Sequence, residues 1–368
     1  MTIKLSSPSY GELEIQAVTR VLQSQVTSMG YETYMFEQEL KQYFGREELN
    51  ILAVNSCTAA LQLALQGVGI KHGDEVLVPS LTYVATFQAV SALGAVPIPC
   101  DVDDECFIDV EDAESRITHK TKAIIPVLYA GIENNINAVY ELARQYNLYV
   151  IEDAAHSFGS KNTILRDSVF CFSFDPIKNL SCTSGGAIVT PDKELTDRIK
   201  DLRLLDVIGD TERRINGERS WDFDVKEQGW RYHMGNLCAA IGRAQLSRIN
   251  FIGNIRCSVA SRYASELNGL PHIRLLPINY ETAIPHIFPI IVNEGLRNDL
   301  MQYLLSHDIG CGVQYKPNHL LTYFNRGYSL PNTEKLYSQL LSIPLHPMLS
   351  NDDVTTVIEI VKEWAINI

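Results

Sequence analysis

The fold can be worked out from one stretch of this sequence, Val169-Phe170-Cys171-Phe172-Ser173-Phe174-Asp175-Pro176-Ile177-Lys178-Asn179-Leu180. Its first four residues are apolar and predict a buried strand. A second apolar run, Ala187-Ile188-Val189-Thr190, follows Ser184-Gly185-Gly186 and predicts another strand. Lys178 therefore lies on a short connection between two strands. Most lysines are solvated, so a catalytic role for Lys178 needs support from the rest of the chain.

The bulk composition is that of a globular protein with a surplus of negative charge. The chain has 368 residues, enough for two domains, and its 46% hydrophobic and 20% charged residues are ordinary values. A net charge of −13 argues against a nucleic-acid partner and against an anionic membrane surface. No apolar stretch resembles a signal peptide or approaches the length of a membrane helix, so we expect no membrane partner.

The eight cysteines form no C-x-x-C pair, and several of them lie within apolar runs. This pattern favours reduced, mostly buried thiols in a cytoplasmic protein. It predicts neither a disulfide framework nor a metal site.

Strands and helices alternate through the first two thirds of the chain. Seven apolar runs predict strands, over residues 51–54, 75–79, 95–99, 123–128, 148–151, 169–172 and 187–190. Amphipathic or small-residue segments predict helices between them, two within 9–44 and others over 59–66, 82–93 and 136–146. Because the strands are apolar throughout, this order favours an α/β fold with a mixed, mostly parallel sheet covered on both faces.

The regular alternation stops at residues 206–229, which are polar and predict a long surface loop. Arg213, Arg214 and Arg219 cluster within it. A helix is predicted over 236–249.

We expect a large domain over residues 1–250, including the N-terminal helical segment, and a smaller α+β domain over 251–368. In the smaller domain, apolar runs predict strands near residue 273 and over 284–292, and helices over 297–307 and 333–341. A capping-box pattern, Ser350-x-x-Asp353, predicts the start of the last helix.

Polar groups follow three of the predicted strands. Ser56-Cys57-Thr58-Ala59-Ala60 is a small-residue turn that enters a helix and suits an anion, although a simple N-cap has the same appearance. Asp153 ends a strand and suits a protonated ring nitrogen, or else a structural ion pair. Ser173 and Lys178 follow the third strand. An anion site, a carboxylate and a lysine for an aldehyde together indicate pyridoxal phosphate as the cofactor.

With these motifs in place, the chain resembles the DegT–StrS family of sugar-nucleotide aminotransferases, which has the aspartate aminotransferase type of fold (fold type I). The resemblance covers nearly the whole length. The segments that carry it are Pro8-Ser9-Tyr10-Gly11-Glu12, Thr27-Ser28, Ser56-Cys57-Thr58-Ala59-Ala60-Leu61, Gly73-Asp74-Glu75-Val76, Pro79-Ser80-Leu81-Thr82-Tyr83-Val84-Ala85-Thr86, Glu152-Asp153-Ala154-Ala155-His156, Ser173 to Leu180, and Leu345-His346-Pro347-Met348-Leu349-Ser350.

The resemblance implies roles for the residues at the cofactor ring. It implies that Lys178 forms the Schiff base and shuttles protons, and that Asp153 pairs with the pyridine nitrogen. Tyr83 matches the aromatic residue that stacks on the ring. His156 stands where the family has Gln or His, near the ring hydroxyl.

The resemblance also implies a phosphate site and an obligate homodimer with shared active sites. The phosphate would meet Cys57, Thr58 and the hydroxyl of Ser173. A residue of the neighbouring subunit would complete the site, with Arg231 and His233 as the candidates.

The implied reaction is amino transfer from glutamate to a nucleotide-linked keto-sugar, with C4 favoured over C3, for glycan or O-antigen biosynthesis. Tyr315 and His319 match a segment that approaches the sugar, and Arg213 and Arg214 are further candidate substrate contacts. The alternatives are a dehydratase or lyase that uses the same cofactor, and a non-catalytic cofactor-binding regulator.

Two positions depart from the family pattern. Asp175 replaces the usual histidine, and Thr183-Ser184 replaces the Gly-Glu of the usual Gly-Glu-Gly-Gly run. A branch that carries out dehydration has histidine in place of the lysine, so Lys178 argues against that branch.

Overall fold

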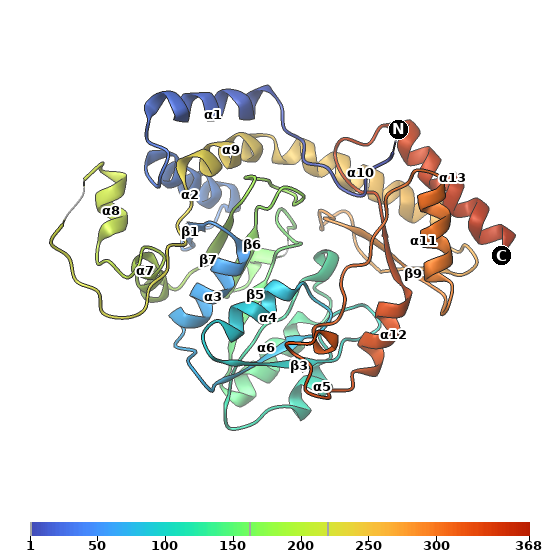
Figure 1. Cartoon of the computed structure of the whole chain (residues 1–368), viewed down its shortest axis with the longest axis horizontal. Helices are drawn as coiled ribbons and strands as arrows, with labels where there is room; N and C mark the ends of the chain where they lie inside the picture. Colours follow the sequence, from blue (N-terminus) through green and yellow to red (C-terminus); the bar gives the residue numbers. More distant parts are fainter. Residues whose placement is uncertain (1, 162, 219–220) are drawn as a thin grey trace.

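The computed structural model describes residues 2–161, 163–218 and 221–368 and contains two sheets (Figure 1). The strands are β1 (Asn50–Val54), β2 (Glu75–Pro79), β3 (Val96–Cys100), β4 (Thr121–Ile124), β5 (Tyr149–Asp153), β6 (Val169–Ser173), β7 (Gly186–Thr190), β8 (Ile273–Leu275), β9 (Phe288–Val292) and β10 (Leu340–Ile343). The helices are α1 (Glu12–Ser24), α2 (Tyr31–Phe44), α3 (Cys57–Gly67), α4 (Val84–Ser91), α5 (Val110–Ser115), α6 (Ile136–Tyr146), α7 (Lys193–Leu202), α8 (Asp210–Ile215), α9 (Asn236–Ser247), α10 (Ile249–Leu267), α11 (Arg297–Ser306), α12 (Pro331–Gln339) and α13 (Asn351–Asn367).

The larger sheet has seven strands in the order β1-β7-β6-β5-β4-β2-β3. Strands β2 to β6 pair in parallel with one another, and β7 pairs antiparallel with both β1 and β6. The mixed, mostly parallel α/β sheet is therefore confirmed. Because β1 runs in the same direction as β6, six strands (β1 to β6) end at the edge where β7 begins. Ligands of open α/β sheets bind at such an edge.

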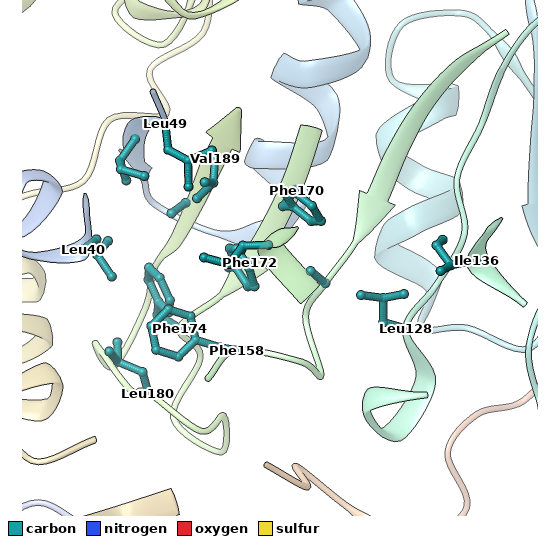
Figure 2. Close-up of a cluster of buried hydrophobic side chains, with 14 of the residues drawn as sticks. Leu40, Leu49, Leu128, Ile136, Phe158, Phe170, Phe172, Phe174, Leu180 and Val189 are labelled. Atoms are coloured by element: carbon teal, nitrogen blue, oxygen red, sulfur yellow. The ribbon is translucent and has the colours of Figure 1, made fainter. Parts of the chain in front are cut away.

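Strand β6 is buried on both faces, and its alternating side chains enter two different cores. Phe170 and Phe172 pack in one cluster with Phe158 and Phe174, and Figure 2 shows Phe158 and Phe174 beside Leu180 with Phe172 and Phe170 farther away. The Phe158 and Phe174 rings meet edge to face, with centroids 5.4 Å apart. Cys171 points to the other face, into the cluster that contains α3. This alternation places Ser173 on the α3 side of the sheet.

The smaller sheet has the order β10-β9-β8 and is antiparallel. Its core contains side chains from α10, α11 and α13, and in Figure 1 α9 and α10 follow one another from the larger sheet toward it. α10 begins one residue before the boundary expected at 250, and the division into domains stays a prediction.

The last helix begins with the predicted capping box. Ser350 Oγ accepts a hydrogen bond from Asp353 N over 3.1 Å, and Ser350 N donates to Asp353 Oδ2 over 2.9 Å. Because an N-cap serine is worth about 1 kcal/mol, we expect Ser350→Ala to lower the free energy of unfolding by about that amount in urea titrations. Thr356→Ala, on an exposed position of the same helix, is the control and should cost nothing. Equal losses in both variants would refute the capping role.

The structure corrects the predicted loop over 206–229, because α8 lies within it. Asp210 and Glu212 occupy the first turn of α8, Arg213 and Arg214 occupy the last, and Arg214 pairs with Asp210 one turn away. Acidic residues at the amino end and basic ones at the carboxyl end stabilise a short helix through its dipole. Arg219 lies outside the described residues.

Other predicted boundaries also change. β4 ends at Ile124 rather than Leu128, and the helix predicted over 333–341 ends at Gln339 because the next residues form β10. α5, α7 and α10 had not been predicted.

The segment around α12 is bonded to the larger sheet and also packs against β9 of the smaller one. Asp101, which follows β3, accepts hydrogen bonds over 2.6 Å from both the backbone N and the Oγ1 of Thr333. A distant carboxylate therefore caps the amino end of α12, which has no side-chain cap of its own. No helix among the described residues is both long and apolar enough to cross a membrane.

Candidate active site

The turn between β1 and α3 presents free backbone N–H groups at the strand-end edge. Ser56 caps α3, its Oγ accepting from Ala59 N over 3.1 Å, so the N-cap reading of this turn holds for Ser56. Cys57 and Thr58 form the first turn of the helix and line a cavity. The amino end of an eleven-residue helix attracts an anion.

Gly186 allows β7 to pass directly beneath this turn. A Cβ atom at position 186 would lie 2.6 Å from the Ser56 carbonyl carbon and 2.7 Å from Cys57 N. Both atoms belong to the backbone and cannot rotate away. A glycine is therefore required here by close packing.

We expect Gly186→Ala to reduce the free energy of unfolding by about 3 kcal/mol, because overpacking a tight site forces the backbone apart. Gly11→Ala is a suitable control, since the nearest atom to its Cβ would lie at 3.4 Å, an ordinary contact. Denaturant unfolding of both variants measures the difference. Similar values for the two would show that the β7 approach to α3 tolerates a side chain.

Asp153 ends β5 and is held in a defined orientation. Its Oδ2 accepts from Thr86 Oγ1 over 2.7 Å, and its Oδ1 accepts from Ala155 N over 3.2 Å. Thr86 Oγ1 also lies 3.0 Å from Thr82 Oγ1. Burial raises the pKa of Asp153, and the hydrogen bond from Thr86 opposes that rise. The carboxylate is therefore oriented, and within the described part of the chain it forms no ion pair, which suits a cationic ligand.

His156 follows Asp153 and is locked in one tautomer. The N–H of Ala130 donates to its Nδ1 over 3.3 Å, so Nδ1 carries no proton and Nε2–H faces the hydroxyl of Tyr315 at 3.1 Å. Burial lowers its pKa well below the usual value, which keeps the ring neutral. Tyr315 in turn packs against Tyr83, with ring centroids 5.5 Å apart. Tyr83 is 59% exposed and stands at the cavity mouth.

Lys178 projects into the same cavity from the loop after β6. Burial lowers the pKa of its amine to about 8, although Asp153, Cys57 and Asp175 each favour the charged form. A lysine with such a pKa supplies neutral amine near neutral pH, which a nucleophilic lysine requires. Its Nζ lies 3.3 Å from Nε2 of His286, a residue of the segment before β9.

The cavity has a volume of about 330 Å³ and brings together most of the predicted cofactor residues and one predicted substrate contact, Tyr315. Those that line it are Cys57, Thr58, Tyr83, Asp153, His156, Ser173, Lys178 and Tyr315. Among its described lining residues Lys178 is the only lysine or arginine, and Asp153 and Asp175 are carboxylates.

Five predicted residues do not line this cavity within one chain. His319 is buried, with one ring nitrogen 2.8 Å from Ser80 Oγ and the other 3.2 Å from Glu334 Oε1. This places the imidazole in a structural contact rather than in the cavity. The other four are basic residues around α8 and the segment before α9: Arg213, Arg214, Arg231 and His233.

Arg231 and His233 differ in their surroundings. Arg231 is exposed, whereas His233 is partly buried and its Nδ1 has no hydrogen-bond partner among the described residues. Burial, followed by the charges of Arg214 and Arg231, lowers the pKa of His233 to about 4. His233 is therefore neutral near pH 7, whereas Arg231 presents its side chain to solvent.

The sequence reasoning missed Thr86, Thr82 and His286 as site residues. Thr86 lies three residues after Tyr83, one turn along α4, so its spacing from Tyr83 was a usable signal. His286 is 108 residues from Lys178, and nothing in its local pattern indicates the contact.

Solved aminotransferase structures have the same fold. An aminotransferase from Streptoalloteichus hindustanus, TlmJ, is 28% identical, with 99% of this chain and 98% of that chain covered and a TM-score of 0.89. Spr1654 of Streptococcus pneumoniae, whose proposed activity is that of a sugar aminotransferase, has been solved in PLP and PMP forms. The PLP form is 28% identical, with 100% and 99% of the two chains covered and a TM-score of 0.89. The fold is that of a fold-type I aminotransferase.

The sequence pattern of the DegT/DnrJ/EryC1/StrS aminotransferase family matches residues 8–362. The chain belongs to this family, whose members depend on pyridoxal phosphate. An uncharacterised protein of Methanocaldococcus jannaschii is 34% identical over 97% of this chain and 96% of its own length.

Proposed function

We propose that this protein uses pyridoxal phosphate to transfer an amino group from glutamate to a nucleotide-linked keto-sugar, with C4 favoured over C3. The single observation that carries the cofactor proposal is that Lys178, Asp153 and the amino end of α3 border one cavity. Its volume of about 330 Å³ lies within the range of small-molecule sites. The chemistry of these groups fits the aldehyde, ring nitrogen and phosphate of that cofactor.

When bound, pyridoxal phosphate supplies a carbonyl carbon and an electron-withdrawing ring on which amino groups exchange. Lys178 Nζ gains and loses the reacting proton, for which a pKa of about 8 suits neutral pH. Asp153, held by Thr86, keeps a proton on the ring nitrogen by its negative charge. His156, held in one tautomer, donates its Nε2–H to the Tyr315 hydroxyl and so fixes that side chain, while Tyr83 would cover the bound cofactor ring.

We propose that a second copy of this chain completes the phosphate site through Arg231. The described lining residues of one chain contain no arginine, while a phosphate binds best to charge-assisted donors. Arg231 is exposed and charged, whereas His233 is partly buried and neutral. Arg213 and Arg214 lie on the same part of the chain, and we assign them to the anionic nucleotide of the acceptor across the same interface.

The keto-sugar proposal is supported by the proposed sugar-aminotransferase activity of Spr1654. The position of Tyr315 beside Tyr83 at the cavity mouth also supports it, because aromatic walls suit a sugar ring. We propose that the amino-sugar product is made in the cytoplasm and is used to build glycans such as an O-antigen.

A panel of nucleotide-linked 3-keto and 4-keto deoxysugars, each assayed with glutamate, tests the proposal. We expect an amino-sugar nucleotide and one equivalent of 2-oxoglutarate, with the greatest kcat/KM for a 4-keto acceptor. A product that has lost water and gained no nitrogen would establish a dehydratase instead. Greater activity with the 3-keto sugars would overturn the C4 preference alone.

A further inference from the structure

The contact between Lys178 and His286 has no part in the roles assigned above. His286 Nε2 lies 3.3 Å from Lys178 Nζ, and the imidazole is buried, with 3% of the residue exposed. Lys178 comes from the loop after β6 and His286 from the segment before β9, so the contact joins the two sheets. The ring of His156 flanks His286, with centroids 4.5 Å apart.

The hydrogen bond defines the tautomer of His286. A protonated lysine has three donors and no acceptor, so Nε2 must accept and the ring proton must lie on Nδ1. Burial lowers the pKa of His286 well below its usual value, with Lys178 and His156 adding to the effect, so the ring stays neutral beside the ammonium group. His286 therefore has the opposite tautomer to His156.

His286 also lines a small void whose other walls are mostly apolar. Nδ1 and Gln314 Oε1 both lack a hydrogen-bond partner among the described residues, and both side chains line the same void of about 10 Å³. That volume is roughly enough for a single water molecule. A donor at Nδ1 and an acceptor at Gln314 match the tautomer derived from the lysine contact.

Arg256 fixes the backbone on both sides of the contact. Its Nη1 donates to the carbonyl oxygens of His286 and Leu345, and its Nη2 donates to that of Ile177, the residue before Lys178. Arg256 is 2% exposed. A single guanidinium group thus connects the residue before the lysine to His286 itself, which keeps the two side chains in register.

We propose that His286 is a positioning residue for Lys178: its Nε2 accepts one N–H of the lysine whether that lysine is an ammonium or an amine. The other two positions on Nζ are then directed toward the cavity: both hold protons in the ammonium form, and one of them holds the lone pair in the amine form. An untethered lysine has four rotatable bonds and a large rotamer entropy to lose. The effect of this contact on turnover rests on the proposed function, whereas the existence of the contact does not.

Competitive labelling of the full chain, freed of cofactor, with trace acetic anhydride measures the titration of Lys178 directly. The extent of acetylation of the peptide that contains Lys178 is followed by mass spectrometry against pH. The groups that face the lysine besides His286 are Asp153, Cys57, Asp175, Arg256 and His156, and they are unchanged in every variant used. For the unmodified chain we expect a midpoint near pH 8.

His286→Phe removes the acceptor, so the ammonium form loses a hydrogen bond and the midpoint should fall by about one pH unit. His286→Gln should restore the midpoint, because its longer amide can place an oxygen where Nε2 lies. His286→Asn should lower the midpoint as His286→Phe does, since its shorter amide cannot place an oxygen where Nε2 lies. It replaces the phenylalanine variant in this test if that variant does not fold. His346→Phe is the matched control, because this buried histidine bonds to the Lys4 carbonyl at 3.0 Å and not to Lys178.

Midpoints within about 0.3 pH units of the unmodified chain for both His286→Phe and His286→Asn would overturn the inference. A midpoint in His286→Gln as low as in His286→Phe would also overturn it, since an acceptor would then not matter. Labelling needs neither cofactor nor sugar. If the amino-transfer assays fail while the labelling midpoints are as expected, the proposed function is refuted and the contact between Lys178 and His286 is not.

Discussion

Lys178→Ala is expected to abolish amino transfer, with turnover falling by about 10⁴-fold or more. One substitution removes both the nucleophile and the group that moves the reacting proton, and general acid–base catalysis alone is worth about 10² to 10⁴. Turnover is measured from 2-oxoglutarate formation with glutamate and the best keto-sugar of the panel. Borohydride reduction of the loaded enzyme followed by peptide mapping should fix the cofactor to Lys178 in the unmodified chain only.

Lys193→Ala is the matched control, because this lysine has a side chain that is 76% exposed on α7 and pairs with Asp197 on the same helix. It should leave turnover and the visible absorbance of the loaded enzyme unchanged. A Lys178→Ala protein that retains a tenth of normal turnover would refute the proposed role. An unmodified protein without a visible absorbance band after incubation with cofactor would refute the cofactor itself.

Asp153→Asn is expected to reduce kcat by about a thousandfold, because removing one partner of a buried ion pair costs about 3–5 kcal/mol. The amide keeps the shape of the carboxylate and can still accept from Ala155 N, which donates over 3.2 Å. The loss should therefore come from the missing charge rather than from misfolding. Steady-state kinetics and cofactor titration by absorbance measure kcat and affinity separately.

The neighbouring carboxylate Glu152 provides the control for Asp153. Its side chain pairs with Arg166 over 2.7 Å and accepts from Tyr140. Glu152→Gln should lower thermal stability while leaving kcat and cofactor absorbance nearly unchanged. If Glu152→Gln and Asp153→Asn reduced kcat equally, the assignment of Asp153 to the ring nitrogen would fail.

The parts of the fold that could be predicted are those with a strong local pattern. Strand β6 is apolar at every position before Ser173, and helix α6 begins and ends where its periodicity predicts. α8 was missed because its six residues are too few for a clear hydrophobic period, and its stability comes from charge order.

The candidate site divides in the same way. The convergence of three parts of the site follows from topology, because the strands concerned meet at one edge of the sheet. Ser56 to Thr58 follow β1, Asp153 ends β5 and Ser173 ends β6. The contact of His286 with Lys178 joins two sheets and depends on Arg256, which no local motif reveals. The burial of His319 between Ser80 and Glu334 is likewise a product of tertiary packing.

The anchoring of the segment around α12 determines how the cavity wall would behave mechanically. Asn318 donates to the Thr82 carbonyl over 2.8 Å, and Thr333 is bonded to Asp101, so this segment is fastened at two points to the larger sheet. β10, which follows α12 directly, belongs to the smaller sheet. The same segment is also bonded to the smaller sheet, because Gly312 exchanges backbone hydrogen bonds with Ser342 of β10 and Leu336 of α12 packs with Ile291 of β9. The wall that carries Tyr315 therefore bridges the two sheets, and a rotation of one sheet against the other would strain it from both ends.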